Sequence, residues 1–319
     1  MIRRIVLLLF ASALFTTLAG AVTDARLVSL LDPQTRVIAG LNGTGVKASP
    51  FGQYLLSESA KTDLSHFIAS TGFDPRTNLQ QVLFGSAGDA NNSQRVLLVK
   101  GTFVPAQVLA FAVKKGATAS SYRGVNVAEF PASQRKNGKS HPARWLAILS
   151  STRAAFGTPA LVQHAIDRYV DNTAADAGVA SRIASASGRY DAWYVSTVPG
   201  PEVALSLPQS SNELSGLAAT ALQSVQSEMA GVKFAQGASV QGQAVTASDQ
   251  EALSLADRIR YMASVAETQA TQKQKSTLAS LIQKVSVTTQ GVNVIWSVQV
   301  PESQLQTLAQ AHHKHQSGQ

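Results

Sequence analysis

The feature that most constrains this chain is a strand that runs through a Val-Pro step directly into a helix, and it occurs twice. In Gln94–Ala112 the apolar pattern changes from the strand period to the helical period at Pro105. The same change occurs at Pro301 within Trp296–Ala309. Proline suits this step because its fixed φ fits the first turn of a helix, where its missing N–H is not needed. The sequence therefore predicts a strand-to-helix junction at both places.

A repeated four-residue segment favours two related halves. Gly-Val-Asn-Val occurs at 124–127 and again at 291–294, both times just after a predicted turn and inside a predicted strand. Hairpins interrupted by single helices are typical of antiparallel sheet covered by helices. We therefore predict an α+β fold with two related halves, 22–189 and 190–311, each an antiparallel sheet with helices packed on one face. A polar, His-containing tail follows at 312–319.

Two local patterns carry specific expectations for the second half. Gln241 and Gly242 are expected to form a two-residue turn between strands within 232–248. A long helix is expected over 212–230.

Gly43–Ala48 matches the dinucleotide-binding pattern G-x-G-x-x-A in sequence. In that motif the helix starts inside the glycines and points its N–H groups at pyrophosphate. Here Ser49 and Pro50 place the expected helix start after the motif, so we interpret the segment as a flexible turn and predict no cofactor.

The first residues have the pattern of a secretory signal. Arg3 and Arg4 form a basic segment, an apolar run follows to Leu18, and Ala19-Gly20-Ala21 has the form of a cleavage site. A membrane anchor is the alternative, but it needs about 20 apolar residues, and this run is shorter. We expect residues 1–21 to be removed, and a soluble, periplasmic or secreted protein without an integral membrane segment.

Composition excludes several classes of protein. The chain has no Cys, which excludes disulfides and thiolate metal sites. Without Arg3 and Arg4 the formal net charge falls from +8 to +6, and the basic residues are scattered, so we expect no nucleic-acid partner. One polar loop concentrates positive charge and is the predicted contact with an anionic surface: Arg135, Lys136, Lys139 and Arg144.

Two serine motifs indicate no catalytic site. Ser133 and Lys136 match S-x-x-K, and Ser210 with Asn212 matches S-x-N, two elements of penicillin-recognising enzymes, but the third element, K-T-G, is absent. A lysine must be buried to activate a serine at neutral pH, and Ser133 lies in the most polar loop. We predict no catalytic residues.

The histidine and tryptophan residues are candidate binding residues. The tail histidines could hold a metal loosely, but no carboxylate ligands lie near them in sequence, so we predict no metal site: His312, His313 and His315. Each tryptophan falls in a predicted strand and is expected to anchor the core, with a carbohydrate platform as the alternative: Trp145, Trp193 and Trp296.

Turn and cap segments carry a resemblance. With Leu31-Asp32-Pro33, Ser49-Pro50-Phe51-Gly52, Thr71–Pro75 and the closing hairpin-Pro-helix, the chain resembles a group of uncharacterised exported bacterial proteins. Those proteins share a signal peptide and α+β repeats. The resemblance implies export and fold class, and it implies no activity, cofactor or site.

These observations favour a non-enzymatic envelope protein that binds an unknown envelope component or has a structural role. Two alternatives stay open: an envelope hydrolase with a non-standard site, and a carrier of an apolar ligand held between sheet and helices. Polar residues converging in a closed pocket would favour the hydrolase. A deep apolar cavity would favour the carrier.

Overall fold

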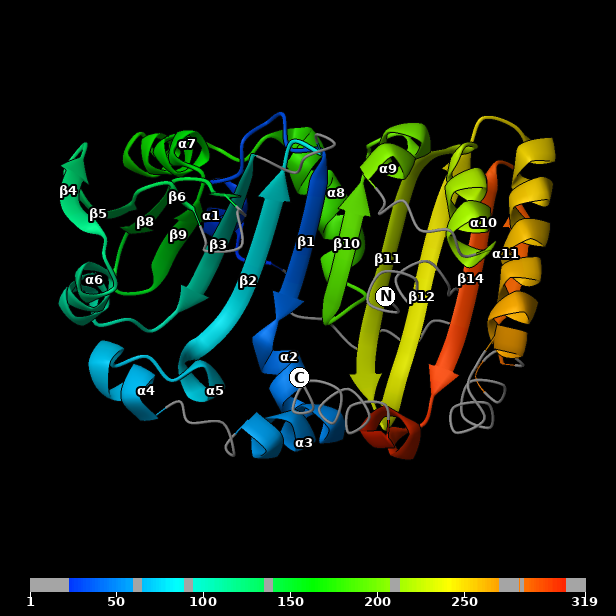
Figure 1. Cartoon of the computed structure of the whole chain (residues 1–319), viewed down its shortest axis with the longest axis horizontal. Coiled ribbons are helices and arrows are strands. Elements are labelled where there is room, and N and C mark those ends of the chain that lie inside the picture. The colour runs from blue at the N-terminus through cyan, green and yellow to red at the C-terminus, as the bar shows by residue number, and fades with distance from the viewer. Residues whose placement is uncertain are drawn as a thin grey trace.

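The chain forms one continuous antiparallel sheet with helices packed against it. The computed structural model describes residues 23–59, 65–88, 94–134, 140–206, 213–269, 281 and 284–307. Its main sheet has 12 strands in the order β13-β14-β12-β11-β10-β1-β2-β3-β9-β8-β5-β4 (Figure 1). The predicted α+β class with antiparallel sheet is confirmed.

The strands of the first half are β1 (Val37–Asn42), β2 (Leu79–Ser86), β3 (Arg95–Gly101), β4 (Thr118–Tyr122), β5 (Val125–Phe130), β8 (Arg144–Ile148) and β9 (Arg153–Gly157). Those of the second half are β10 (Ala192–Ser196), β11 (Val225–Ala235), β12 (Gly237–Thr246), β13 (Ser286–Gln290) and β14 (Asn293–Val300). A separate two-stranded sheet consists of β6 (Ser133–Gln134) and β7 (Ser140–His141).

The helices of the first half are α1 (Ala25–Val28), α2 (Gly43–Ala48), α3 (Pro50–Ser59), α4 (Ser65–Thr71), α5 (Pro75–Asn78), α6 (Pro105–Lys114), α7 (Pro159–Val170) and α8 (Ala177–Ser187). Those of the second half are α9 (Gly200–Ser206), α10 (Glu213–Leu222) and α11 (Asp249–Gln269), followed by helical residues 302–307. In the described ranges, no helix combines the length and the apolar character needed to cross a membrane.

The two predicted halves share the sheet. The predicted boundary between residues 189 and 190 lies between α8 and β10, and β10 pairs with β1, Val195 opposite Ile38. Both Gly-Val-Asn-Val segments start at the turn of a hairpin that follows a helix, β4-β5 and β13-β14. Whether the halves superpose stays a prediction.

Helices cover both faces of the sheet, so the prediction that they pack on one face is wrong. On β3, Val96 and Leu98 pack with α1, α7 and α8 in the largest core cluster, on what we call the α7 face. Val99 points the other way and packs with α6, on what we call the α6 face. Because β3 is apolar on both faces, helices on a single face would have left one apolar face in water.

The same α6 face extends across the whole sheet. Directly paired residues lie on one face, and the pairing runs Val99, Val82, Leu41, Ala192, Val232, Val240, Val298. In the second half this face carries Trp296 and is covered by α10 and α11. The α6 face is thus covered by α4 and α6 at one end and by α10 and α11 at the other (Figure 1).

Local signals succeeded at both predicted junctions and failed at two other segments. Val104 is the N-cap of α6 and Pro105 is its first residue, as predicted. At the second junction, β14 ends at Val300 and helical residues 302–307 follow Pro301. The expected flexible turn Gly43–Ala48 is instead helix α2, because the side chain of Asn42 accepts a hydrogen bond from the Gly45 N–H at 3.1 Å and caps it. The expected helix over 212–230 ends at Leu222, and the remainder belongs to β11.

The turn expected at Gln241 and Gly242 is wrong. The chain turns at Gly237, whose φ of 114° favours glycine, and residues 241 and 242 lie within β12. Gly242 is required there for a different reason: a Cβ would lie 2.6 Å from Trp296. The glycine makes room for an indole ring rather than for a turn.

Candidate functional site: an apolar cavity

A cavity of about 430 Å³ lies on the α6 face between the sheet and two helices. Strands β2, β3, β9, β8 and β5 form its floor, and α4 and α6 cover it. Of the residues that line it, all but Thr71 and Lys115 are apolar. Six are aromatic: Phe67, Phe73, Phe103, Phe111, Phe130 and Phe156.

The aromatic rings hold the wall in place. Phe67 on α4 meets Phe111 on α6 edge to face, with 5.5 Å between ring centroids. Phe73 stacks on Phe103 at 5.1 Å. Such pairs contribute about 0.5–1.5 kcal/mol beyond their buried area. The rings therefore tie the two helices together and fix the shape of this wall.

The floor is only partly covered. Leu98 on the α7 face is fully buried, whereas Leu97 and Val99 on the α6 face are half-buried. Phe156 also lines the cavity and keeps 38% of its surface exposed. The cavity thus opens to solvent beside Phe156.

The two polar lining residues do not form a catalytic group. The Thr71 hydroxyl donates to the Phe67 carbonyl at 2.7 Å, which satisfies it within the helix. Lys115 is the one titratable residue of the lining, and its Nζ lies 5.3 Å from the centroid of the Phe111 ring. General acid–base or nucleophilic chemistry needs at least a second polar group within hydrogen-bond reach. This cavity therefore favours binding over hydrolysis.

Two arginines lie beside the open end of the cavity. Register places Leu97 and Leu146 opposite Phe156, and Arg95 and Arg144 two residues further along β3 and β8. Residues two apart on a strand share a face. Both arginines therefore lie on the α6 face, one row beyond the cavity floor. Burial, and secondarily the positive charge of Arg95, lowers the pKa of Arg144.

Of the predicted anionic-surface contacts, Arg144 is thus in β8 rather than in the loop. Arg135, Lys136 and Lys139 lie outside the described residues. So do the tail histidines and the Ser210–Asn212 motif. Ser133 is exposed in β6. Elsewhere, in the parts that the structure describes, no group of three or more His, Asp or Glu could hold a metal ion.

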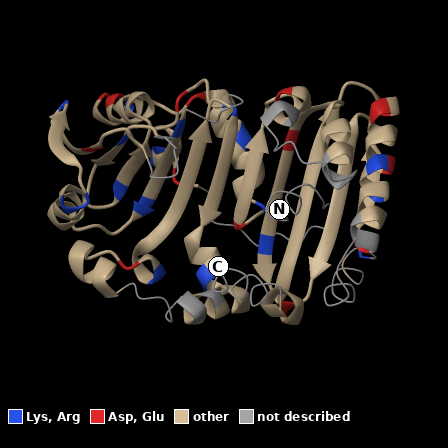
Figure 2. Ribbon diagram, viewed as in Figure 1, with Lys and Arg blue, Asp and Glu red and all other residues tan. Residues whose placement is uncertain are grey.

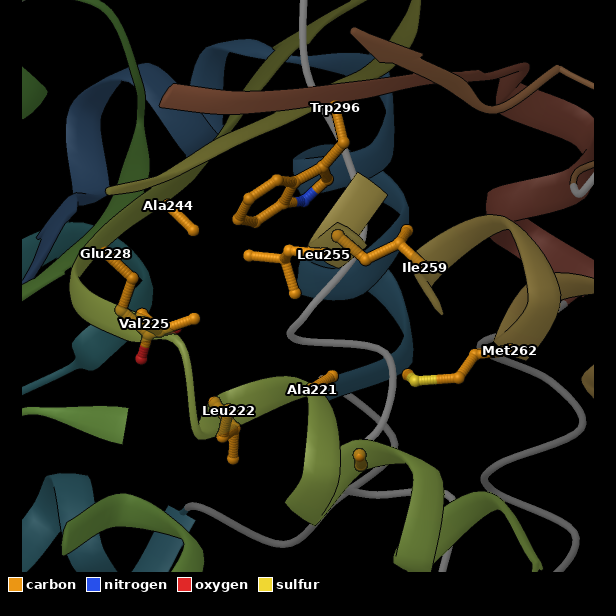
Figure 3. Close-up of a pocket in the computed structure, with 10 residues that line it drawn as sticks. Ala221, Leu222, Val225, Glu228, Ala244, Leu255, Ile259, Met262 and Trp296 are labelled. Carbon is orange, nitrogen blue, oxygen red and sulfur yellow. The ribbon is translucent and has the colours of Figure 1, made fainter. Parts of the chain in front are cut away.

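The tryptophans are core anchors, as predicted. Trp193 and Trp296 are 5% and 1% exposed, and Trp145 packs half-buried against the core on the α7 face. Trp296 fills the opposite end of the α6 face, where a space of only about 20 Å³ remains between β14 and the helices α10 and α11. Figure 3 shows its indole lying next to Leu255 and Ile259 of α11.

One acidic residue borders this small space. Burial raises the pKa of the Glu228 carboxyl, and a hydrogen bond with Tyr194 partly offsets that effect. Its Oε2 atom is buried and has no hydrogen-bond partner in the described part of the chain. The space is too small for a ligand of more than a few atoms, so Glu228 is a packing feature of this end.

Comparisons with known proteins give no family match and a distant structural similarity. No protein-family model and no curated protein sequence matches the chain. A solved structure described as "Structure of crystal form I of TP0453" is similar over 92% of this chain and 98% of that one, with 9% identity and a TM-score of 0.47. A likeness at this level carries no argument about function.

Sequence reasoning missed the cavity because its residues come from seven elements between 67 and 156. One signal was available. The run Val96-Leu97-Leu98-Val99 is apolar at every position, which indicates a strand covered on both faces. A second was the six phenylalanines, which fall within the first half of the chain.

Proposed function

We propose that the protein is a non-enzymatic binding protein that holds an apolar ligand, or the apolar part of a ligand, in the cavity on the α6 face. One observation carries the proposal: a volume of about 430 Å³ bounded almost entirely by aliphatic and aromatic side chains and open beside Phe156. Ligand sites typically have volumes of about 300–1,000 Å³ and predominantly apolar walls. The carrier is thus favoured over the hydrolase.

The binding free energy would come from removal of apolar surface from water. Leu97, Val99 and Phe156 are partly exposed on the cavity side, and a ligand would cover them. Burial contributes roughly 25 cal/mol for each Å² of apolar surface. The phenylalanine pairs already fix much of the wall, which lowers the entropy cost of ordering it on binding.

Export belongs to the same proposal. The basic and apolar pattern of residues 1–21 supports a secretory signal, and with it a periplasmic or secreted location. An exported carrier would meet apolar molecules of the envelope. Contact of Arg135, Lys136 and Lys139 with an anionic surface stays a separate prediction, testable by vesicle co-sedimentation of the triple Ser variant at low and high salt.

The test is a titration with N-phenyl-1-naphthylamine, a neutral apolar fluorophore. We expect saturable binding of one molecule per chain. Ala154 lines the cavity, so Ala154→Leu should fill part of it and weaken binding about tenfold, equivalent to about 1.4 kcal/mol.

The matched control is Ala184→Leu, which adds the same side chain on an exposed position of α8. It should leave the affinity unchanged. Absence of saturable binding, or equal weakening by both variants, would contradict the proposed function.

A further inference from the structure

We propose that the ligand is an amphiphile whose apolar chain lies in the cavity and whose anionic head group binds Arg95 and Arg144. This inference rests on the proposed function and adds the chemical class of the ligand. It is carried by the position of two arginines at the open end of an otherwise apolar cavity.

The strand register brings the two arginines together. Gly157 pairs with both Val96 and Trp145, so Arg95 and Arg144 flank the same position of β9 from its two sides. The residue between them is Thr158, whose N–H donates to the Arg95 carbonyl at 3.0 Å. Neighbouring strands are about 4.8 Å apart, so the two Cα atoms are separated by roughly 10 Å, and both side chains can reach one head group.

The head-group position is continuous with the cavity. Phe130 lines the cavity and lies directly opposite Arg144 on β5, and it contacts Phe156 edge to face at 6.4 Å. The alkyl chain of a ligand that passes the exposed Phe156 ring would therefore leave the apolar floor. Two residues further along the strands it would reach the two arginines.

Neither guanidinium group has a counter-charge among the residues that the structure describes. Within the described ranges, neither forms an ion pair with Asp or Glu, and the one side-chain hydrogen bond of Arg144 goes to the carbonyl of Ala143 at 3.1 Å. Other arginines on this part of the chain are paired: Arg153 binds Asp24, and Arg123 binds Asp167 and Asp171. Two like charges that flank one strand repel one another, and an anion between them would remove that repulsion.

Charged residues are sparse on the sheet, and the chemistry of the guanidinium group indicates which head group would bind. Figure 2 shows the sheet as mostly uncharged, with Lys and Arg confined to a few places. The planar guanidinium binds carboxylate or phosphate oxygens through two parallel N–H donors. An alkyl carboxylate and an alkyl phosphate share this chemistry, and they are separate arms of the test.

Lys115 is the competing cation. It also lines the cavity, but it is the C-cap residue of α6, and its Nζ lies over the Phe111 ring. A head group at Lys115 would reverse the orientation of the ligand. Variants of Lys115 therefore distinguish the two possible orientations of the ligand in the cavity.

The experiment compares three ligands that share an alkyl chain of the same length: dodecanol, dodecanoate and dodecyl phosphate. The affinity of each is measured by its displacement of the neutral fluorophore. For the unmodified protein we expect one or both anions to bind about tenfold tighter than dodecanol, equivalent to about 1.4 kcal/mol. Arg95→Ala and Arg144→Ala should each remove most of this preference and leave dodecanol binding unchanged. Arg95→Lys should retain part of it, because the charge is kept.

Lys114→Ala is the matched control, since it removes an exposed charge of α6 that does not line the cavity. Equal affinities for all three ligands would overturn the inference. So would a preference that survives both arginine variants, or one that is lost in Lys115→Ala instead. Failure of the fluorophore and of all three ligands to bind would contradict the proposed function itself, and the inference with it.

Discussion

The two ends of the α6 face differ in how completely they are filled. At the C-terminal end, Trp296 is 1% exposed and leaves a space of about 20 Å³. Gly242 and Ala244 on the neighbouring strand make room for its ring. At the N-terminal end, the corresponding layer holds a cavity of about 430 Å³. One face of one sheet therefore carries both a closed core and an open cavity.

Helix length accounts for part of the difference. At a rise of 1.5 Å per residue, the 21 residues of α11 extend about 32 Å, whereas the 10 residues of α6 extend about 15 Å. Five strands make a floor roughly 19 Å wide, so one short helix cannot cover it. The 7 residues of α4 add little length. An apolar sheet face under short helices is thus left partly uncovered.

The largest expected effect comes from emptying the closed end. Trp296→Ala should lower the free energy of unfolding by about 3–5 kcal/mol, because the lost transfer energy is joined by the cost of the new cavity. Urea unfolding measures it. Phe156→Ala at the open end should cost much less, because the ring is 38% exposed. Equal losses would show that both ends are packed alike and would break the comparison.

A smaller effect concerns the ion pairs of Asp24, which lie on the α7 face of the strands that form the cavity floor. Lys100 and Arg153 are cross-strand partners on β3 and β9, and the Asp24 carboxylate binds Lys100 at 2.6 Å and Arg153 at 3.1 Å. Burial acts to raise the pKa of Asp24, but hydrogen bonds from Lys100, Arg153 and the Leu27 N–H outweigh it and lower the pKa to about 2. We expect Asp24→Asn to cost about 2 kcal/mol at pH 7.

The pH dependence has a definite sign. A depressed pKa in the folded state means that the stabilisation is present above the ordinary value of 3.8 and is lost as the pH falls towards 2. The difference between Asp24→Asn and the unmodified protein should therefore shrink in urea unfolding near pH 2. A difference that is the same at pH 7 and near pH 2 would mean that Asp24 acts through packing and not through charge.

The smallest expected effect concerns Glu228 at the closed end. Its raised pKa means that the folded state favours the protonated form, so stability is lost as the pH rises from the ordinary value of 4.5 through the raised one. Glu228→Gln should raise the thermal midpoint by a few degrees at pH 7.5 and change little at pH 4. A midpoint that is lower at pH 7.5 would show that the carboxylate is stabilised in the fold by interactions that outweigh its burial.

The sequence by itself determined the class of fold and its local junctions. Strand-period runs with hairpin turns required antiparallel sheet, and Pro105 fixed the start of a helix through its φ. These are properties of a residue and its nearest neighbours, so pattern reasoning reaches them.

Tertiary structure decided the rest. Gly242 has the same local signature as a turn glycine, yet it lies in a strand, because its neighbour across the sheet is Trp296. Arg144 was expected to belong with a basic loop, but the pairing of β8 with β9 places it beside Arg95, 49 positions earlier in the chain, at the mouth of the cavity. The cavity itself depends on which strands pair and on how far short helices extend over them. Such long-range distances follow from packing and register, which no local pattern specifies.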